Sequence, residues 1–223
     1  MDSTSNVIAF RAADTASAEC ERASVDTPVL PDDGALMLRY RQGDVHAFEI
    51  LYTRHKGALY RYLQRLCRNK DAVNDLFQET WSKVIASRDK YEPRAQFGAF
   101  LFRIAHNCAV DYFRRAERQR IGRTDDVTEL DEVLPGTDTE RPDAQFSEAQ
   151  LQTAFKQALH QLPIEQRNVF VLYEETGLTL EEIGQVTGVG FETAKSRLRY
   201  ALSKLRNALR PFDPRDNSAG GPS

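Results

Sequence analysis

The first long stretch of the chain, residues 35–120, carries apolar side chains every three to four positions, the period of an amphipathic helix. The pattern is interrupted at Gly43-Asp44, at Asn69-Lys70 and at Pro93, which are residues that favour turns or stop a helix. The pattern therefore predicts four helices in this stretch. We expect them to bury their apolar faces against one another as one small helical domain.

A second helical stretch runs over residues 146–210 and is divided by Pro163 and Gly177. Residues 121–145, which lie between the two stretches, are acidic and contain proline and glycine, so we expect a flexible linker. The sequence thus predicts an all-α fold with two small helical domains joined by a flexible acidic linker. The segments outside these domains, 1–34 and 211–223, lack periodicity, and we expect both to be mobile.

Two helices joined by a tight turn are predicted between Thr179 and Arg210. Thr179 is placed to cap the first of these helices, and Glu182 follows three residues later to complete a capping box. Gly184 has no side chain where a second helix would approach closely, and Gly188 suits the left-handed conformation of a sharp helix end. This order of features favours a helix-turn-helix over an ordinary helical hairpin.

The second helix of this pair is expected to begin near Phe191 and to reach at least Leu209. Four cations line one flank of its apolar arc: Lys195, Arg199, Arg206 and Arg210. A helix that packs by one side and presents cations on another is typical of a recognition helix in the major groove of DNA. The alternative is a solvated basic face with no ligand.

The helix expected from Asp71 to about Ser87 has two different faces. Its apolar side chains fall on one side: Val73, Phe77, Trp81 and Val84. Its polar side chains fall on the other: Asp71, Asp75, Gln78, Glu79 and Ser82. Because Asp75 and Glu79 repel each other at a spacing of four residues, we interpret this face as a docking surface for a basic partner helix. A plain solvated face is the alternative.

The fourth helix of the first domain ends in a cluster of arginines. Three polar side chains lie on the face opposite its packing stripe: Arg103, Asn107 and Arg114. Cations at a helix C-terminus suit the helix dipole, which alone would explain the cluster. Aromatic side chains interleaved with arginines also suit unstacked bases on a phosphate backbone, so nucleic-acid binding is the functional interpretation.

Composition narrows the classes of function further. The net charge is only −3, so nucleic-acid binding would have to come from local basic patches. The sequence has no Gly-rich phosphate loop, no metal-ligand cluster and no Ser/His/Asp arrangement. His106 and Cys108 point to different sides of a helix and have no second pair. We therefore expect no enzyme activity, no small-molecule substrate, no cofactor and no metal.

No apolar run approaches the length of a membrane span, and the N-terminus lacks the features of a signal peptide. The cysteines are scattered singly, which favours free thiols in a reducing compartment. We therefore expect a cytoplasmic protein with no membrane insertion.

Three segments together resemble the bacterial RNA polymerase sigma factors of the extracytoplasmic-function (ECF) group. DAVNDLFQETWSKV is similar to the polymerase-binding segment of that family, and FGAFLFRIAHNCAVDYFRR is similar to the segment that recognises the −10 promoter element. The sequence from Leu159 to Arg206 resembles the family's second domain, which reads the −35 element. The resemblance implies sigma region 2 at residues 35–120 and sigma region 4 at 146–210.

The resemblance also implies site residues and partners. The residues at the polymerase-docking positions, which meet the β′ coiled coil, are Asp75, Gln78 and Glu79. The positions for unpaired −10 DNA, including the loop from Tyr91 to Gln96, are Tyr91, Arg94, Gln96, Arg103, Asn107, Arg114 and Arg115. The positions for the −35 duplex are Glu192, Thr193, Lys195, Ser196, Arg197 and Arg199. Further implied partners are the β flap of core RNA polymerase, promoter DNA and an anti-sigma factor.

Two residues depart from the family's usual pattern. Glu192 places a carboxylate near DNA, where it either accepts from a cytosine amino group or turns away. Gly184 replaces a more usual alanine and costs about 1 kcal/mol of helix propensity. A stand-alone helix-turn-helix regulator is the alternative function, although the first domain offers neither an obvious ligand pocket nor a heptad seam for a dimer.

Overall fold

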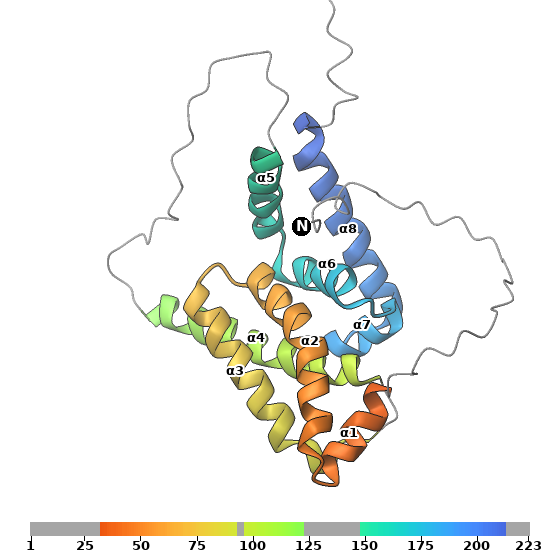
Figure 1. The fold of residues 1–223 in the computed structure, drawn as a ribbon. Coiled ribbons are helices and arrows are strands. Elements are labelled where there is room, and N and C mark those ends of the chain that lie inside the picture. The colour runs from red at the N-terminus through yellow and green to blue at the C-terminus, as the bar shows by residue number, and fades with distance from the viewer. Residues whose placement is uncertain (1–31, 93–95, 123–147, 213–223) are drawn as a thin grey trace, which may run out of the picture. The chain divides into compact units, whose positions relative to one another are not determined.

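A computed structural model of the chain describes residues 32–92, 96–122 and 148–212. The expectations for the N-terminal extension up to residue 31, for most of the linker, for the tail after 212 and for Arg94 lie outside these residues. The described elements form one compact unit. They are α1 (Asp33–Arg41), α2 (Val45–Leu66), α3 (Lys70–Ala86), η1 (Arg88–Lys90), α4 (Phe97–Gly122), α5 (Glu148–Gln161), α6 (Ile164–Thr176), α7 (Leu180–Thr187), α8 (Phe191–Leu209) and η2 (Arg210–Phe212). The all-α prediction is confirmed (Figure 1).

The helix boundaries follow from capping residues in the sequence. Asp44 accepts a hydrogen bond from the Ala47 amide at the start of α2, and Asn69 accepts from the amides of the first turn of α3. Gly43 takes a φ of 101° in the turn between α1 and α2. The first helix begins at Asp33, slightly before the boundary expected from periodicity, because Asp32 caps it.

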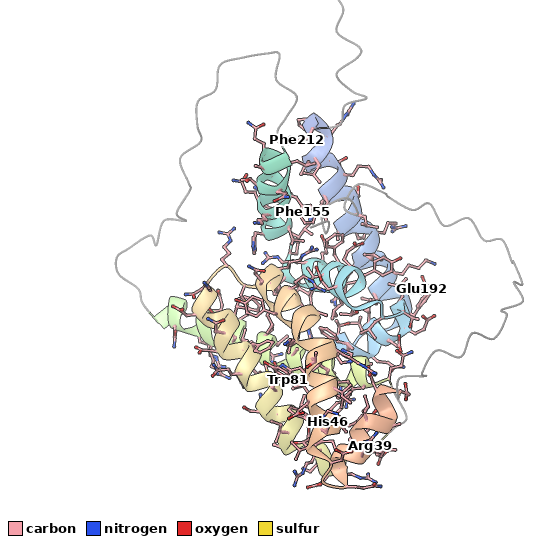
Figure 2. The ribbon with its side chains drawn as sticks, in the orientation of Figure 1. Arg39, His46, Trp81, Phe155, Glu192 and Phe212 are labelled. Carbon is pink, nitrogen blue, oxygen red and sulfur yellow. The ribbon has the colours of Figure 1, made fainter. Side chains whose placement is uncertain are left out.

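The first four helices enclose an aromatic core. Trp81 lies between α2 and α3 (Figure 2), where its ring meets Phe48 edge-on at a centroid distance of 5.7 Å. Tyr52 packs on the same indole at 5.0 Å. α4 completes this layer by packing against both α2 and α3. The face of α3 that the sequence predicted to be buried is therefore the one that faces the core.

The helix-turn-helix of α7 and α8 is formed as predicted. Thr179 and Glu182 make both hydrogen bonds of the capping box, and Gly188 ends α7 with a φ of 70°. A Cβ added to Gly184 would lie 2.8 Å from the Val189 carbonyl oxygen, closer than real Cβ contacts come. Glycine at this position therefore lets the turn fold tightly against α7, which accounts for its cost in helix propensity.

Polar side chains link α2 with α6 across a surface that we call the α2–α6 seam, formed by Arg61, Tyr62, Arg65, Asn168 and Glu175. The Tyr62 hydroxyl donates to Asn168 Oδ1 at 2.7 Å, and the Asn168 amide donates to Nδ1 of His106 on α4 at 2.6 Å. Glu175 accepts from Arg61 at 2.6 Å and from Arg65 at 2.9 Å. Burial raises the pKa of Tyr62, so its hydroxyl stays protonated as a donor.

We expect Asn168→Ala to lower the free energy of unfolding by about 1–3 kcal/mol, because it leaves the buried Tyr62 hydroxyl without its acceptor. Urea unfolding followed by Trp81 fluorescence measures the change. Asn207→Ala, at an exposed position of α8, is the matched control and should change the free energy by less than about 0.5 kcal/mol. Equal effects of the two substitutions would show that the seam does not stabilise the fold.

Candidate polymerase and nucleic-acid interfaces

The outer face of α3 presents the predicted docking residues unequally. Asp75 and Gln78 are exposed, whereas Glu79 is half-buried and pairs with Lys83 at 2.7 Å. The Lys83 ammonium also donates to Cys108 Sγ on α4 at 3.4 Å, and the hydrogen bond with Glu79 raises its pKa. A basic partner would therefore compete with Lys83 for Glu79. Glu79 and Lys83 are four residues apart, a spacing at which opposite charges pair on a helix, so this ion pair could have been predicted from the sequence. The prediction was based only on the repulsion between Asp75 and Glu79.

Most of the residues predicted for −10 DNA lie on one helix, α4. The exposed ones are Arg103, Asn107, Arg114 and Arg115, and Gln96 is exposed just before the helix begins. Intervals of four and seven residues place Arg103, Asn107 and Arg114 along one stripe. Tyr91 differs from the expectation, because its side chain is only 1% exposed and packs on Phe97 and Phe100. Its ring is therefore part of the core and is not presented to DNA.

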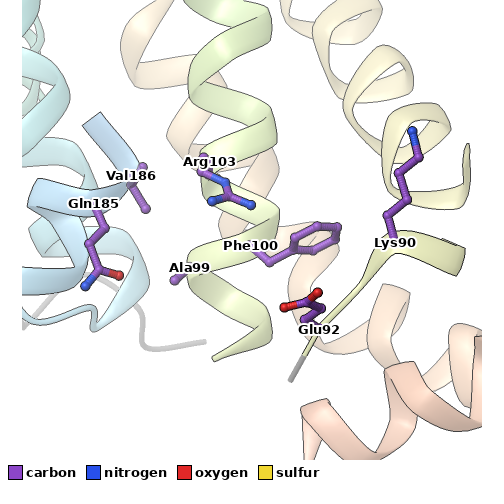
Figure 3. A pocket seen from close by; sticks show the side chains of 7 residues that line it. All are labelled: Lys90, Glu92, Ala99, Phe100, Arg103, Gln185 and Val186. Atoms are coloured by element: carbon purple, nitrogen blue, oxygen red, sulfur yellow. The ribbon is translucent and has the colours of Figure 1, made fainter. Parts of the chain in front are cut away.

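Arg103 also lines a hollow of about 320 Å³ between α4 and α7 (Figure 3). Phe100 of α4 lies beside it, and Lys90 and Glu92 follow α3 on one side. The opposite wall comes from Gln185 and Val186 of the helix-turn-helix. Of the lining groups, the two cations and the aromatic ring suit an unstacked base and its phosphate, whereas the Glu92 carboxylate would repel a phosphate.

The residues predicted for the −35 duplex divide into two sets on α8. Glu192, Thr193, Lys195 and Arg199 are exposed, and Glu192 projects at the N-terminal end of the helix (Figure 2). Ser196 and Arg197 are half-buried. Two of the exposed cations lie over aromatic rings, with the Lys195 ammonium 5.6 Å from the centre of Phe191 and the Arg199 guanidinium 5.1 Å from that of Tyr200.

The charge of Arg197 acts on His106 of α4. Burial, and to a lesser extent the charge of Arg197, lower the pKa of His106, the residue that accepts from Asn168. The neutral imidazole is therefore favoured at the point where α4 meets the second set of helices. The sequence placed Arg197 among the exposed DNA contacts, whereas its side chain is half-buried and its charge acts on His106. Neither this interaction nor the α2–α6 seam can be recognised from neighbouring residues in the sequence.

In the parts of the chain that the structure describes, no three His, Cys, Asp or Glu side chains group as metal ligands. Among the same residues, no helix combines the length and the apolar character that crossing a bilayer requires. Cys67 and Cys108 are buried free thiols.

His160 on α5 gives the fold a defined pH dependence. Burial, followed by the charges of Arg167 and Arg68, lowers its pKa from 6.5 to about 4. Its Nδ1 lies 3.2 Å from the Arg167 guanidinium, so the neutral ring is the acceptor. The unfolded chain binds the proton at a higher pH than the folded one, so the free energy of unfolding should fall as the pH drops from about 6.5 towards 4.

Urea unfolding at pH 7 and pH 5 tests this expectation. His160→Gln should reduce the difference in unfolding free energy between the two pH values. A smaller difference of the same sign should remain, because burial also lowers the pKa of His106. Asn207→Ala, which replaces an exposed residue of α8 that does not titrate, is the control and should keep the wild-type difference. A wild-type difference in the His160 variant would contradict the assignment.

Comparisons with known proteins agree with the order of these surfaces. Residues 51–119 match sigma-70 region 2, and residues 158–207 match sigma-70 region 4. The RNA polymerase sigma factor CarQ of Myxococcus xanthus is 33% identical over 78% of this chain and 95% of its own. The ECF RNA polymerase sigma factor SigE of Mycolicibacterium smegmatis is 32% identical over 75% of this chain and 63% of its own.

A solved structure shares the fold. The sigma factor RpoE of Bartonella quintana, crystallised with the anti-sigma factor NepR, has a TM-score of 0.59 and 24% identity over 73% of this chain and 96% of its own. The chain belongs to the sigma-70 family of RNA polymerase sigma factors, in its extracytoplasmic-function group.

Proposed function

We propose that this sigma factor joins core RNA polymerase through the outer face of α3 and reads a promoter with two separate surfaces. The exposed stripe of α4 would hold the unpaired strand of the −10 element. The exposed cations of α8 would meet the −35 duplex in its major groove. The observation that carries the proposal is that the helix-turn-helix and the acidic face of α3 both occur, in the family's order, within one chain.

The partners follow from surface charge and from the family. An acidic face on α3 suits the basic coiled coil of the β′ subunit. Membership of the family implies the β flap as a further partner, for the second set of helices. Control by an anti-sigma factor is supported by the complex of the Bartonella relative with NepR. Such a partner would act by covering the same surfaces that polymerase and promoter require.

The test is reconstitution. Purified chain is added to sigma-free bacterial core polymerase, and the complex is isolated by size exclusion. Transcription is then started on genomic fragments from the organism that encodes the chain. A stable complex that starts transcripts at defined sites supports the proposal. Binding of duplex DNA by the chain alone, with no polymerase complex, would instead support a stand-alone regulator.

A further inference from the structure

Phe191 is a large apolar side chain exposed on a helix that is otherwise polar on its outer face. It is 38% exposed, and it is the first residue of α8. Single exposed apolar residues are common and need no explanation by themselves. The position is what matters here, because the N-terminal residues of the second helix in a helix-turn-helix are those that meet base edges.

The local structure holds the ring in place. Helical periodicity places Phe191 on the same side of α8 as the buried Ala194 and Leu198, so its ring is held partly covered at the N-terminal turn and stays 38% exposed. Glu192, the next residue, is exposed. The Lys195 ammonium lies 5.6 Å from the ring centre and 3.9 Å from the Glu192 carboxylate. The end of α8 therefore presents an apolar ring, a carboxylate and an ammonium side by side.

The chemistry of the Phe191 ring points to one base. In the major groove only thymine carries a methyl group, and contact with an apolar side chain such as phenylalanine is the usual way to read it. A solvated phosphate offers such a ring no apolar surface. We propose that Phe191 is a specificity-determining residue that contacts the 5-methyl group of a thymine in the −35 duplex. The proposal rests on the proposed function, which places α8 in that groove.

Tyr200 provides the comparison within the same helix. It is also exposed, at 52%, and also lies beside a cation, Arg199. Nine residues separate it from Phe191, or about 13 Å along the helix axis. It lies beyond the first turn, so its removal should not change the preference for one base.

The experiment uses the full chain bound to core polymerase. A pool of random duplexes is selected on this complex, and the −35 site is read from the enriched sequences. Each thymine of that site is then replaced by deoxyuridine, which keeps every hydrogen-bonding group and lacks only the methyl group. Competition binding compares the two duplexes for wild type, Phe191→Ala, Phe191→Leu and Tyr200→Ala.

We expect uracil at one position to weaken wild-type binding roughly threefold to fivefold, the effect of exposing one methyl-sized apolar group. Phe191→Ala should bind both duplexes equally, and Phe191→Leu should retain part of the preference. Tyr200→Ala should retain all of it. If Phe191→Ala does not fold, Phe191→Gln replaces it and should likewise show no preference.

Two results would overturn the proposal. One is a wild-type complex that is indifferent to uracil at every thymine of the site, and the other is a Phe191→Ala complex with the wild-type preference. Both leave the proposed function standing, because a −35 site was selected. Failure to form the polymerase complex, or to select any site, would instead overturn the proposed function and this assignment with it.

Discussion

A chain that carries both Asp75→Lys and Glu79→Lys is expected to lose stable binding to core RNA polymerase and to keep its fold. Both side chains lie on the outer face of α3, away from the aromatic core around Trp81. Reversal would place ammonium groups against a basic partner, and like charges across an interface cost several kcal/mol. We therefore expect affinity to fall on the order of 100-fold or more. Glu79→Lys also places the new ammonium group beside that of Lys83, which is the present partner of Glu79.

Titration of a labelled chain with sigma-free core polymerase measures the decrease in affinity, and urea unfolding checks the fold. Asp75→Lys alone separates the effect on the partner from the new repulsion beside Lys83, and it should account for much of the decrease. Glu165→Lys, an equal change of charge at an exposed position of α6, should bind normally. If the double variant binds polymerase as the wild type does, the docking face is not on this side of α3.

Replacing Lys195 and Arg199 by alanine is expected to weaken binding to the −35 duplex and to flatten its dependence on salt. Each residue is an exposed cation on the outer side of α8. A cation that neutralises a phosphate releases a counterion, so removing one such cation lowers the slope of log K against log salt by about 0.9. Phosphate contacts carry no sequence information, so the decrease in affinity should be similar on all duplexes.

Binding isotherms at several salt concentrations measure the slope. Lys204→Ala is the matched control, because Lys204 is an exposed lysine of the same helix that lies nine residues from Lys195 and hence on the opposite side. It should leave the slope unchanged. A normal slope in the Lys195 and Arg199 variants would mean that other residues bind the phosphates. A decrease in affinity confined to one sequence would indicate base contacts instead.

Local rules were sufficient to predict the helices and the helix-turn-helix. The capping box of Thr179 and Glu182 and the left-handed Gly188 depend on residues only a few positions apart, so the sequence displays them directly. The two faces of α3 follow from periodicity in the same way. The structure adds the reason for Gly184, which is the nearby Val189 carbonyl oxygen.

Contacts between distant residues could not be predicted. Tyr62 and Asn168 are 106 residues apart, and nothing in either neighbourhood marks them as partners. The electrostatic effect of Arg197 on His106 and the burial of Tyr91 also depend on tertiary packing. The predicted exposure was therefore more accurate for Lys195 and Arg199, where it follows from helical periodicity, than for residues that lie near other helices.

α7 packs against α4, whereas the two promoter elements lie far apart on DNA. By their numbering the elements lie about 25 base pairs apart, which is about 85 Å of duplex at 3.4 Å per pair. Arg103 and Gln185 line one hollow of about 320 Å³, so the helix proposed for the −10 element and the helix-turn-helix proposed for the −35 element are neighbours here. Under the proposed function, simultaneous occupation of both elements would require α4 and α7 to separate. That separation would break the hydrogen bonds of Asn168 and the ion pairs of Glu175, so under the proposed function these contacts would oppose promoter engagement.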